Sequence, residues 1–208
     1  MAKPILYGAE YSVYVRIARM TLEEKGADYE LAPVDIFAAD GIPAWYLEHH
    51  PFGRIPAFEH DGFRLFETSA IARYVDEAFD GPPLQPADPR GRARVDQITG
   101  MLDAYGYRAM VWDVAVERLE KMPADESLIA GGLGLAEPVL KVLTSLKAEG
   151  PWLLGDQLTL ADLHTAPIIA YFVKVAEGRD LLARFADIEE WYMRVAARPS
   201  FAKTEKAG

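Results

Sequence analysis

A nine-residue stretch without helical or strand periodicity, Gly81-Pro-Pro-Leu-Gln-Pro-Ala-Asp-Pro89, divides the 208-residue chain into two differently patterned parts. Its prolines remove backbone donors and fix φ, so neither a helix nor a central strand continues through it. Strand-like and helix-like segments alternate before this stretch, whereas only helical spacing follows it. We therefore expect a domain of residues 1–80, a linker of residues 81–89 and a second domain of residues 90–208.

The first part has the alternation of an α/β unit. Asp61-Gly62, a dipeptide favoured in two-residue hairpin turns, stands between two short apolar segments. Ser12 precedes apolar residues at helical spacing that end at Lys25-Gly26, which predicts a helix with a capped start and a glycine at its end. The expected strands are 4–7, 29–34, 56–60 and 63–66, and the expected helices are 12–26, a short piece at 44–48, and 70–78.

The second part is predicted to be entirely helical. Thr159 and Asp162 form a capping-box pattern in which aspartate takes the place of glutamate, and this pattern predicts the start of a helix. The fold class is therefore α/β followed by all-α. The expected helices of this part are 91–121, 125–149, 159–176 and 187–197.

The charge balance limits the possible partners. Lys and Arg number 22 against 32 Asp and Glu, a net charge of −10, and no run of basic residues is present. Binding to nucleic acid or to an anionic membrane surface needs a basic face, so we expect neither. The longest apolar run, 166–173, is too short to span a bilayer, and the first residues lack the continuous apolar region of a secretory signal. These features predict a cytoplasmic protein.

Cysteine is absent from the chain. Its absence excludes disulfides, thiolate metal sites and thiol–disulfide exchange by a protein cysteine. His49 and His50 are adjacent, so their side chains diverge, and no third ligand accompanies them. We expect no metal site.

Several motifs in the same order resemble the cytosolic glutathione S-transferases, closest to their serine-type members of the phi and theta kind. The resemblance covers nearly the whole chain and implies a thioredoxin-like βαβ-ββα domain followed by an all-helical domain. Separately, the frequent use of Ala, Arg and Asp suggests a bacterial source. The motifs are Tyr7-Gly8…Ser12, Leu22-Glu-Glu-Lys-Gly-Ala-Asp-Tyr29, Val34-Asp-Ile-Phe-Ala38, His50-Pro-Phe-Gly-Arg-Ile-Pro-Ala57, Phe66-Glu-Thr-Ser-Ala-Ile-Ala-Arg-Tyr74 and Gly155-Asp-Gln-Leu-Thr-Leu-Ala-Asp162.

The resemblance implies that glutathione is the co-substrate and assigns residues to bind it. Pro56 matches the family's cis-proline, which leaves the backbone of Ile55 free to pair with the cysteinyl backbone of glutathione. Glu67 and Thr68 match the acid and hydroxyl residues that bind the γ-glutamyl amine and carboxylate. Taken alone, Pro56 reads as an ordinary hairpin start, and Glu67 and Thr68 as common first-turn helix residues.

Ser12 matches the residue that activates the bound thiol. A thiol of pKa near 8.5 is about 3% ionised at pH 7, and lowering this pKa by ~2 units requires ~2.7 kcal/mol. A hydroxyl donating to a charged sulfur contributes about 1.5 to 3 kcal/mol, so Ser12 suffices. Its alternative role is an ordinary N-cap. Tyr7 is the rival, because other classes use a tyrosine at the end of the first strand.

One departure from the phi pattern concerns the end of glutathione that carries its glycine. Phi members have a basic pair after the second strand, whereas Gly41 and Ile42 stand at those places here. Arg54, where the family has glutamine, replaces some of this charge or is simply a solvated arginine. We expect weaker glutathione binding than in a phi member.

The resemblance also implies an electrophile site between the domains, to which Tyr11, Tyr105, Met110 and Trp112 are assigned. A row of Met and aromatic side chains at helical spacing is, however, more often part of a core than of a ligand site. The function expected is conjugation of the glutathione thiolate to small apolar electrophiles, as in detoxification. Two alternatives stay open: glutathione-dependent isomerisation or dehalogenation, and a non-catalytic binding or interaction protein. A two-fold homodimer is expected from the family.

Overall fold

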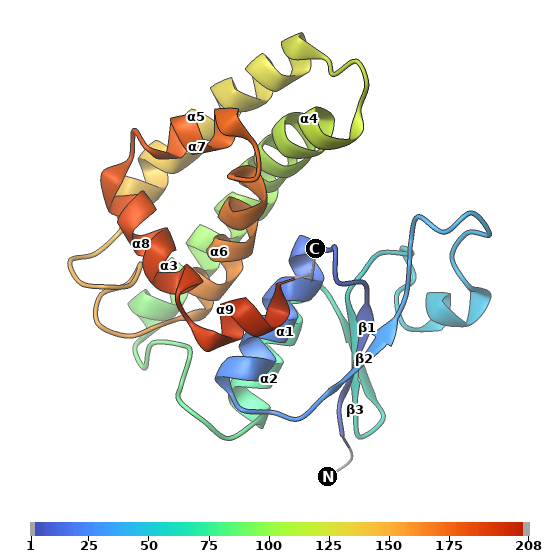
Figure 1. Ribbon diagram of the computed structural model, residues 1–208. Helices are drawn as coiled ribbons and strands as arrows, with labels where there is room; N and C mark the ends of the chain where they lie inside the picture. Colours follow the sequence, from blue (N-terminus) through green and yellow to red (C-terminus); the bar gives the residue numbers. More distant parts are fainter. Residues whose placement is uncertain (1–2, 206–208) are drawn as a thin grey trace. The chain divides into compact units, whose positions relative to one another are not determined.

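The computed structural model describes residues 3–205 and separates into two compact units. One unit contains the chain up to Pro83 together with the segment from Pro199 onward, and the other is Leu84–Arg198. Figure 1 traces the elements of each unit along the chain.

The first unit is built on a four-stranded sheet with the order β2-β1-β3-β4, in which β1 and β2 are parallel and the other pairs antiparallel. This is the expected thioredoxin-like arrangement, and the predicted strands and hairpin are confirmed. The turn between β3 and β4 has positive φ at Asp61 (50°) and Gly62 (79°), as a two-residue hairpin turn requires. The elements are β1 (Ile5–Gly8), α1 (Val13–Glu24), β2 (Glu30–Pro33), η1 (Ala44–Glu48), β3 (Ala57–His60), β4 (Phe63–Phe66) and α2 (Thr68–Ala78).

The core of this unit lies between the sheet and its helices. Leu6 on β1 is paired with Phe58 on β3, and both side chains are fully buried. They belong to one cluster with Leu22 of α1 and Ile71 of α2, and Figure 1 shows α1 and α2 on the same side of the sheet. Because successive strand residues point to opposite faces, Tyr7 is directed to the other face.

The last helix, α9 (Pro199–Thr204), packs on α1. Arg16 Nη2 donates to the carbonyl of Phe201 at 3.0 Å, and Arg19 donates to the carbonyls of Lys203 and Thr204 at 3.3 and 3.4 Å. These guanidinium groups satisfy carbonyls that the end of a helix leaves without partners. The segment from Pro199 therefore groups with the first unit, whereas the sequence pattern placed it in the helical domain.

The second unit is helical, as predicted. The helix expected over 91–121 consists of four consecutive segments, two of which have widened turns: Tyr107 N–H donates to Leu102 O and Glu117 N–H to Trp112 O, both five residues back. The segments are α3 (Pro89–Met101), η2 (Leu102–Gly106), η3 (Arg108–Val116) and α4 (Glu117–Glu120), followed by α5 (Glu126–Leu146), α6 (Leu160–Phe172), α7 (Ala176–Leu182) and α8 (Ala186–Ala196).

The start of α6 contains the predicted capping box. Asp162 is fully buried and accepts hydrogen bonds from Thr159 N (2.8 Å) and Thr159 Oγ1 (2.9 Å). It also accepts from Leu153 N (2.8 Å) and from Trp191 Nε1 of α8 (2.7 Å). Burial raises the pKa of this carboxyl, and the four donors oppose the shift. Asp162 thus joins a loop, α6 and α8 in addition to capping.

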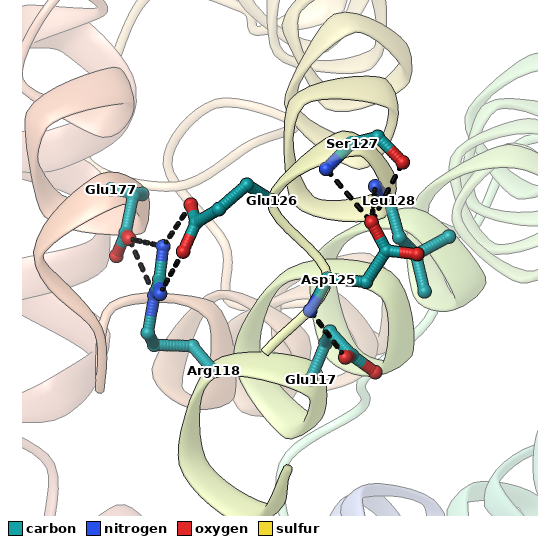
Figure 2. A network of polar contacts seen from close by, with 7 residues as sticks. All are labelled: Glu117, Arg118, Asp125, Glu126, Ser127, Leu128 and Glu177. Atoms are coloured by element: carbon teal, nitrogen blue, oxygen red, sulfur yellow. Dashed lines mark hydrogen bonds and ion pairs between the residues drawn. The ribbon is translucent and has the colours of Figure 1, made fainter. Parts of the chain in front are cut away.

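A second polar junction joins α4, α5 and α7 (Figure 2). Arg118 donates to both carboxylate oxygens of Glu126, at 2.7 and 2.8 Å, and its Nε donates to Glu177 at 2.7 Å. Beside it, Asp125 caps α5 by accepting from Ser127 N (2.9 Å) and Leu128 N (3.1 Å). One guanidinium therefore connects three helices.

Within residues 3–205, α5 is the one helix whose length and apolar composition would permit a membrane span. Only its length and composition support such a span, and core helices of globular proteins often have the same length and composition. Ile129, Ala136 and Leu140 are buried, and α5 packs mainly on η3. We interpret α5 as a helix with one face in the core of the second unit, since other apolar residues on it are exposed.

Candidate active site

Ser12 stands in the turn between β1 and α1. Its Oγ accepts a hydrogen bond from Val15 N at 3.3 Å, and the residue is partly exposed. The hydroxyl proton has no acceptor among the residues that the structure describes. Ser12 therefore caps α1 and still has a proton to donate, in a place where the free N–H groups of a helix start favour negative charge.

Tyr7 lies in an aromatic cluster on the opposite face of the sheet from Leu6. Its ring centroid is 4.5 Å from that of His49, 6.0 Å from that of Trp45 and 6.3 Å from that of Tyr46. Burial raises the pKa of the Tyr7 phenol, and the nearby Glu59 raises it further. These surroundings favour a neutral phenol in a packing role.

Tyr11 is fixed to the loop that follows β2. Its hydroxyl donates to Asp35 Oδ1 at 2.8 Å, the same oxygen accepts from Phe37 N at 2.9 Å, and the rings of Tyr11 and Phe37 are 5.7 Å apart. Burial and the bond to Asp35 raise the pKa of Tyr11 to about 12. The Tyr11 proton is thus already donated within the protein, and Phe37, which is 63% exposed, adds open aromatic surface.

The Arg54-Ile55-Pro56 segment leads into β3. The Ile55–Pro56 peptide bond is cis, and the Arg54 carbonyl accepts from Tyr46 Oη at 2.6 Å. The N–H and C=O of Ile55 form no hydrogen bond with any residue from 3 to 205, so an extended ligand backbone can pair with them. Arg54 is exposed and has no acidic partner in this part of the chain.

Glu67 and Thr68 follow β4 at the start of α2. Glu67 has φ 72° and ψ 114°, a conformation that non-glycine residues rarely adopt, and its exposed side chain makes no capping bond. Thr68 is 6% exposed. Strain of this kind is concentrated at ligand-binding sites, so the backbone at Glu67 independently marks this helix start.

The loop between β2 and η1 carries no cation. Its charged residues are Asp35 and Asp40. Ile42 lies against Gly53, where an added Cβ would come within 2.6 Å of Ile42 Cδ1. The position expected to be basic is therefore filled by an aliphatic side chain that packs on the turn before Arg54.

Sequence reasoning rejected His50 as a metal ligand and did not predict its burial beside Phe66. His50 is 3% exposed, and its ring is 5.0 Å from that of Phe66. The signal available was its place immediately before the Pro-Phe-Gly-Arg-Ile-Pro motif. His49 instead pairs with Glu59 at 3.2 Å. Residues 3–205 contain no group of three or more potential metal ligands.

The three remaining candidates lie in the second unit and differ in exposure. Tyr105 is 68% exposed, Trp112 is partly buried, and Met110 is fully buried. A fully buried side chain packs in the core of its unit, so Met110 is not open to a ligand. Tyr105 and Trp112 keep accessible aromatic surface.

Comparison with known proteins shows the family of this chain. Residues 6–83 match the family model "Glutathione S-transferase, N-terminal domain" and residues 117–204 match "Glutathione S-transferase, C-terminal domain". A glutathione S-transferase of Hyoscyamus muticus is 28% identical over 204 residues, covering 95% of each chain. Glutathione S-transferase APIC of Nicotiana tabacum is 29% identical over 205 residues, again covering 95% of each.

Solved structures give the same result. Poplar glutathione transferase F1 superposes with a TM-score of 0.85 at 26% identity, covering 98% of this chain and 97% of that one. A glutathione S-transferase-I bound with the ligand lactoylglutathione has a TM-score of 0.85 at 25% identity, covering 98% of both chains.

Proposed function

Because the chain belongs to the glutathione S-transferase family, we propose that it is a serine-type glutathione transferase that joins the glutathione thiolate to small apolar electrophiles. The observation that carries the proposal is Ser12, a partly exposed hydroxyl at the start of α1 whose proton has no acceptor within residues 3–205. A thiolate placed there accepts a hydrogen bond from Ser12 and is also stabilised by the positive end of the α1 dipole.

Ser12 suits this role better than either nearby tyrosine. The Tyr11 proton is donated to Asp35, and the Tyr7 ring packs among Trp45, Tyr46 and His49. Both phenols have raised pKa values, which makes them weaker donors to a thiolate than unperturbed tyrosines.

Glutathione binding is assigned to the open backbone of Ile55 before Pro56 and to the start of α2. The exposed Glu67 carboxylate suits the γ-glutamyl ammonium, and Thr68 with the free N–H groups of the helix start suits the γ-glutamyl carboxylate. Arg54 is the nearby cation for the glycine end, and the loop with Gly41 and Ile42 supports the expected weaker affinity.

For the electrophile, Tyr11 and Phe37 provide apolar surface in the first unit. Tyr105 and Trp112 remain candidates in the second unit. A cytoplasmic homodimer acting in detoxification completes the proposal, as expected from the family. The serine chemistry itself serves conjugation, isomerisation and dehalogenation alike, since each begins with the thiolate.

The decisive experiment is a pH titration of the ultraviolet thiolate absorbance of bound glutathione, comparing the native protein with Ser12→Ala and Tyr7→Phe. We expect the thiol to titrate about 1 to 2 pH units below free glutathione in the native protein and in Tyr7→Phe, and near the free value in Ser12→Ala. A shift that persists in Ser12→Ala and disappears in Tyr7→Phe would transfer the role to Tyr7. Bound glutathione with an unshifted thiol would favour the non-catalytic binding protein.

A further inference from the structure

The His50 imidazole is buried in apolar surroundings next to the proposed glutathione site. Its ring centroid lies 5.0 Å from that of Phe66, 6.3 Å from that of Phe52 and 6.5 Å from that of Tyr46. Its Nδ1 is buried and has no hydrogen-bond partner among the described residues. A buried polar atom without a partner costs about 1 to 3 kcal/mol, so a histidine here needs an explanation other than stability.

The ring lies between the two segments assigned to glutathione. On one side, the ring lies 6.3 Å from that of Phe52, in the turn where the His50 carbonyl accepts from Gly53 N at 2.9 Å. On the other side, the ring packs on Phe66, the residue that directly precedes Glu67 and its strained backbone. Loss of the ring would therefore remove packing from Phe52, in the turn before Ile55, and from Phe66, next to the start of α2.

Two charged groups act on the ring, and both belong to the proposed site. Burial lowers the pKa of His50 from its ordinary value of 6.5, Arg54 lowers it further, and Glu67 raises it. The imidazole is thus mainly neutral at pH 7 and does not itself compete for the Glu67 carboxylate. Protonation at acid pH creates a cation that interacts with the Glu67 carboxylate and so opposes binding of a ligand's ammonium there.

We propose that His50 is a positioning residue for the γ-glutamyl end of glutathione: its neutral ring supports Phe66 and leaves the Glu67 carboxylate free for the ligand's ammonium. This inference rests on the proposed function, because Glu67 must be the residue that receives that ammonium. His50 acts through Phe66 and Glu67, with no contact of its own to the reacting sulfur.

The test measures binding of S-methylglutathione by calorimetry at pH 7.5 and pH 5.5. This probe has no thiol, so ionisation at Ser12 makes no contribution. The variants are His50→Phe, which keeps a flat ring without a titrating group, and His50→Ala, which removes the ring. His49→Phe is the matched control, since the adjacent His49 pairs with Glu59 and lies in the Tyr7 cluster.

We expect the native protein and His49→Phe to bind more weakly at pH 5.5 than at pH 7.5, because binding is linked to the neutral form of His50. His50→Phe should bind within about twofold of native at pH 7.5 and lose the acid weakening. His50→Ala should bind about fivefold or more weakly at both pH values, with an unchanged thiol pKa for bound glutathione, because the support of the site is lost while Ser12 is untouched. Circular dichroism of each variant verifies that it is folded.

The inference is overturned if His50→Phe retains the native acid weakening, or if His50→Ala binds as the native protein does. Failure of the native protein to bind S-methylglutathione at pH 7.5 is a different result, because it overturns the proposed function and this inference with it. An altered thiol pKa in a folded His50→Ala would also overturn it, since the effect would then reach Ser12.

Discussion

Glu67 has a left-handed backbone that costs a non-glycine residue about 1 to 3 kcal/mol, and it makes no capping bond in return. Its carbonyl accepts from Ile71 N at 3.0 Å, as any residue at this helix position does, so its side chain adds nothing that offsets the cost. The exposed carboxylate is thus open to a ligand, which supports the proposed role in glutathione binding. Ser12 differs from Glu67, because its cap uses an oxygen lone pair and its proposed activation of the thiol uses the hydroxyl proton.

The strain at Glu67 predicts that two variants differ in stability although both bind glutathione weakly. Glu67→Gly should be more stable than Glu67→Ala by about 1 to 2 kcal/mol, because glycine adopts φ 72° without strain. Both variants should lose about tenfold or more in glutathione affinity, since the charge that pairs with the ammonium is gone. Urea denaturation and calorimetry measure the two quantities. Equal stability of the two variants would show that the backbone is not strained.

At the scale of elements, single buried or clustered polar residues hold the helices of the second unit together. Asp162 joins α6 to α8 and to the loop at Leu153, and Arg118 joins α4, α5 and α7. The sequence pattern predicted Asp162 only as a cap. Its bonds to Leu153 and Trp191 come from segments that the local pattern does not relate to it.

Asp162→Ala should therefore destabilise the protein by about 3 to 5 kcal/mol, because it leaves Trp191 Nε1 and the Leu153 and Thr159 amides buried without an acceptor. Thermal or urea unfolding measures the change. Thr159→Ser, which keeps the hydroxyl, is the control and should lose far less. A cost below about 1 kcal/mol for Asp162→Ala would contradict this role.

The Arg118 junction predicts a dependence of stability on pH (Figure 2). Arg118 holds the pKa of Glu126 below its ordinary 4.5, while Ser127 and backbone N–H groups hold the pKa of Asp125 below 3.8. The unfolded chain binds these protons at higher pH than the folded chain, so this stabilisation is present above the ordinary values and is lost as pH falls through the depressed ones.

Arg118→Met should remove the part of this dependence that belongs to Glu126. Urea unfolding between pH 6 and pH 3 should show a smaller acid loss of stability for Arg118→Met than for the native protein. At low salt and pH 6 the variant should be the less stable of the two, and high salt should narrow the difference. An identical slope against pH in both proteins would rule out the pairing as its source.

At the scale of the whole molecule, the chain's last helix belongs to the unit formed by its first residues. Arg19, which is 8% exposed, donates to two carbonyls at the end of α9, and its Nε donates to the Tyr29 hydroxyl. Ser200 hydrogen-bonds Glu24 of α1 as well. The first unit is therefore closed by residues more than 170 positions apart.

Arg19→Ala should lower the stability of the protein by about 2 kcal/mol, because three hydrogen bonds are lost and helix-end carbonyls are left unpaired. Limited proteolysis should show earlier cleavage near residue 199 in this variant. Lys203→Ala is the control: its pair with Glu23 is exposed at the lysine, and such pairs contribute at most about 1 kcal/mol. Equal protection in both variants would contradict the role of Arg19.

The sequence by itself determined what depends on neighbouring residues. The Asp61-Gly62 turn, the Ser12 and Thr159 caps, the end of α1 and the α/β-then-helical order are all set by backbone preferences and hydrogen bonds within a few positions. For the same reason the motif order was enough to identify the family.

Only the tertiary structure decided what depends on packing between distant segments. It buried Met110, enclosed Tyr7 among η1 side chains, tied Tyr11 to Asp35, placed His50 against Phe66 and docked α9 on α1. Local pattern cannot specify these outcomes, because burial and hydrogen-bond pairing depend on which distant elements pack together. The same side chain can be buried, exposed or hydrogen-bonded in different packings, and only the folded structure selects one of them.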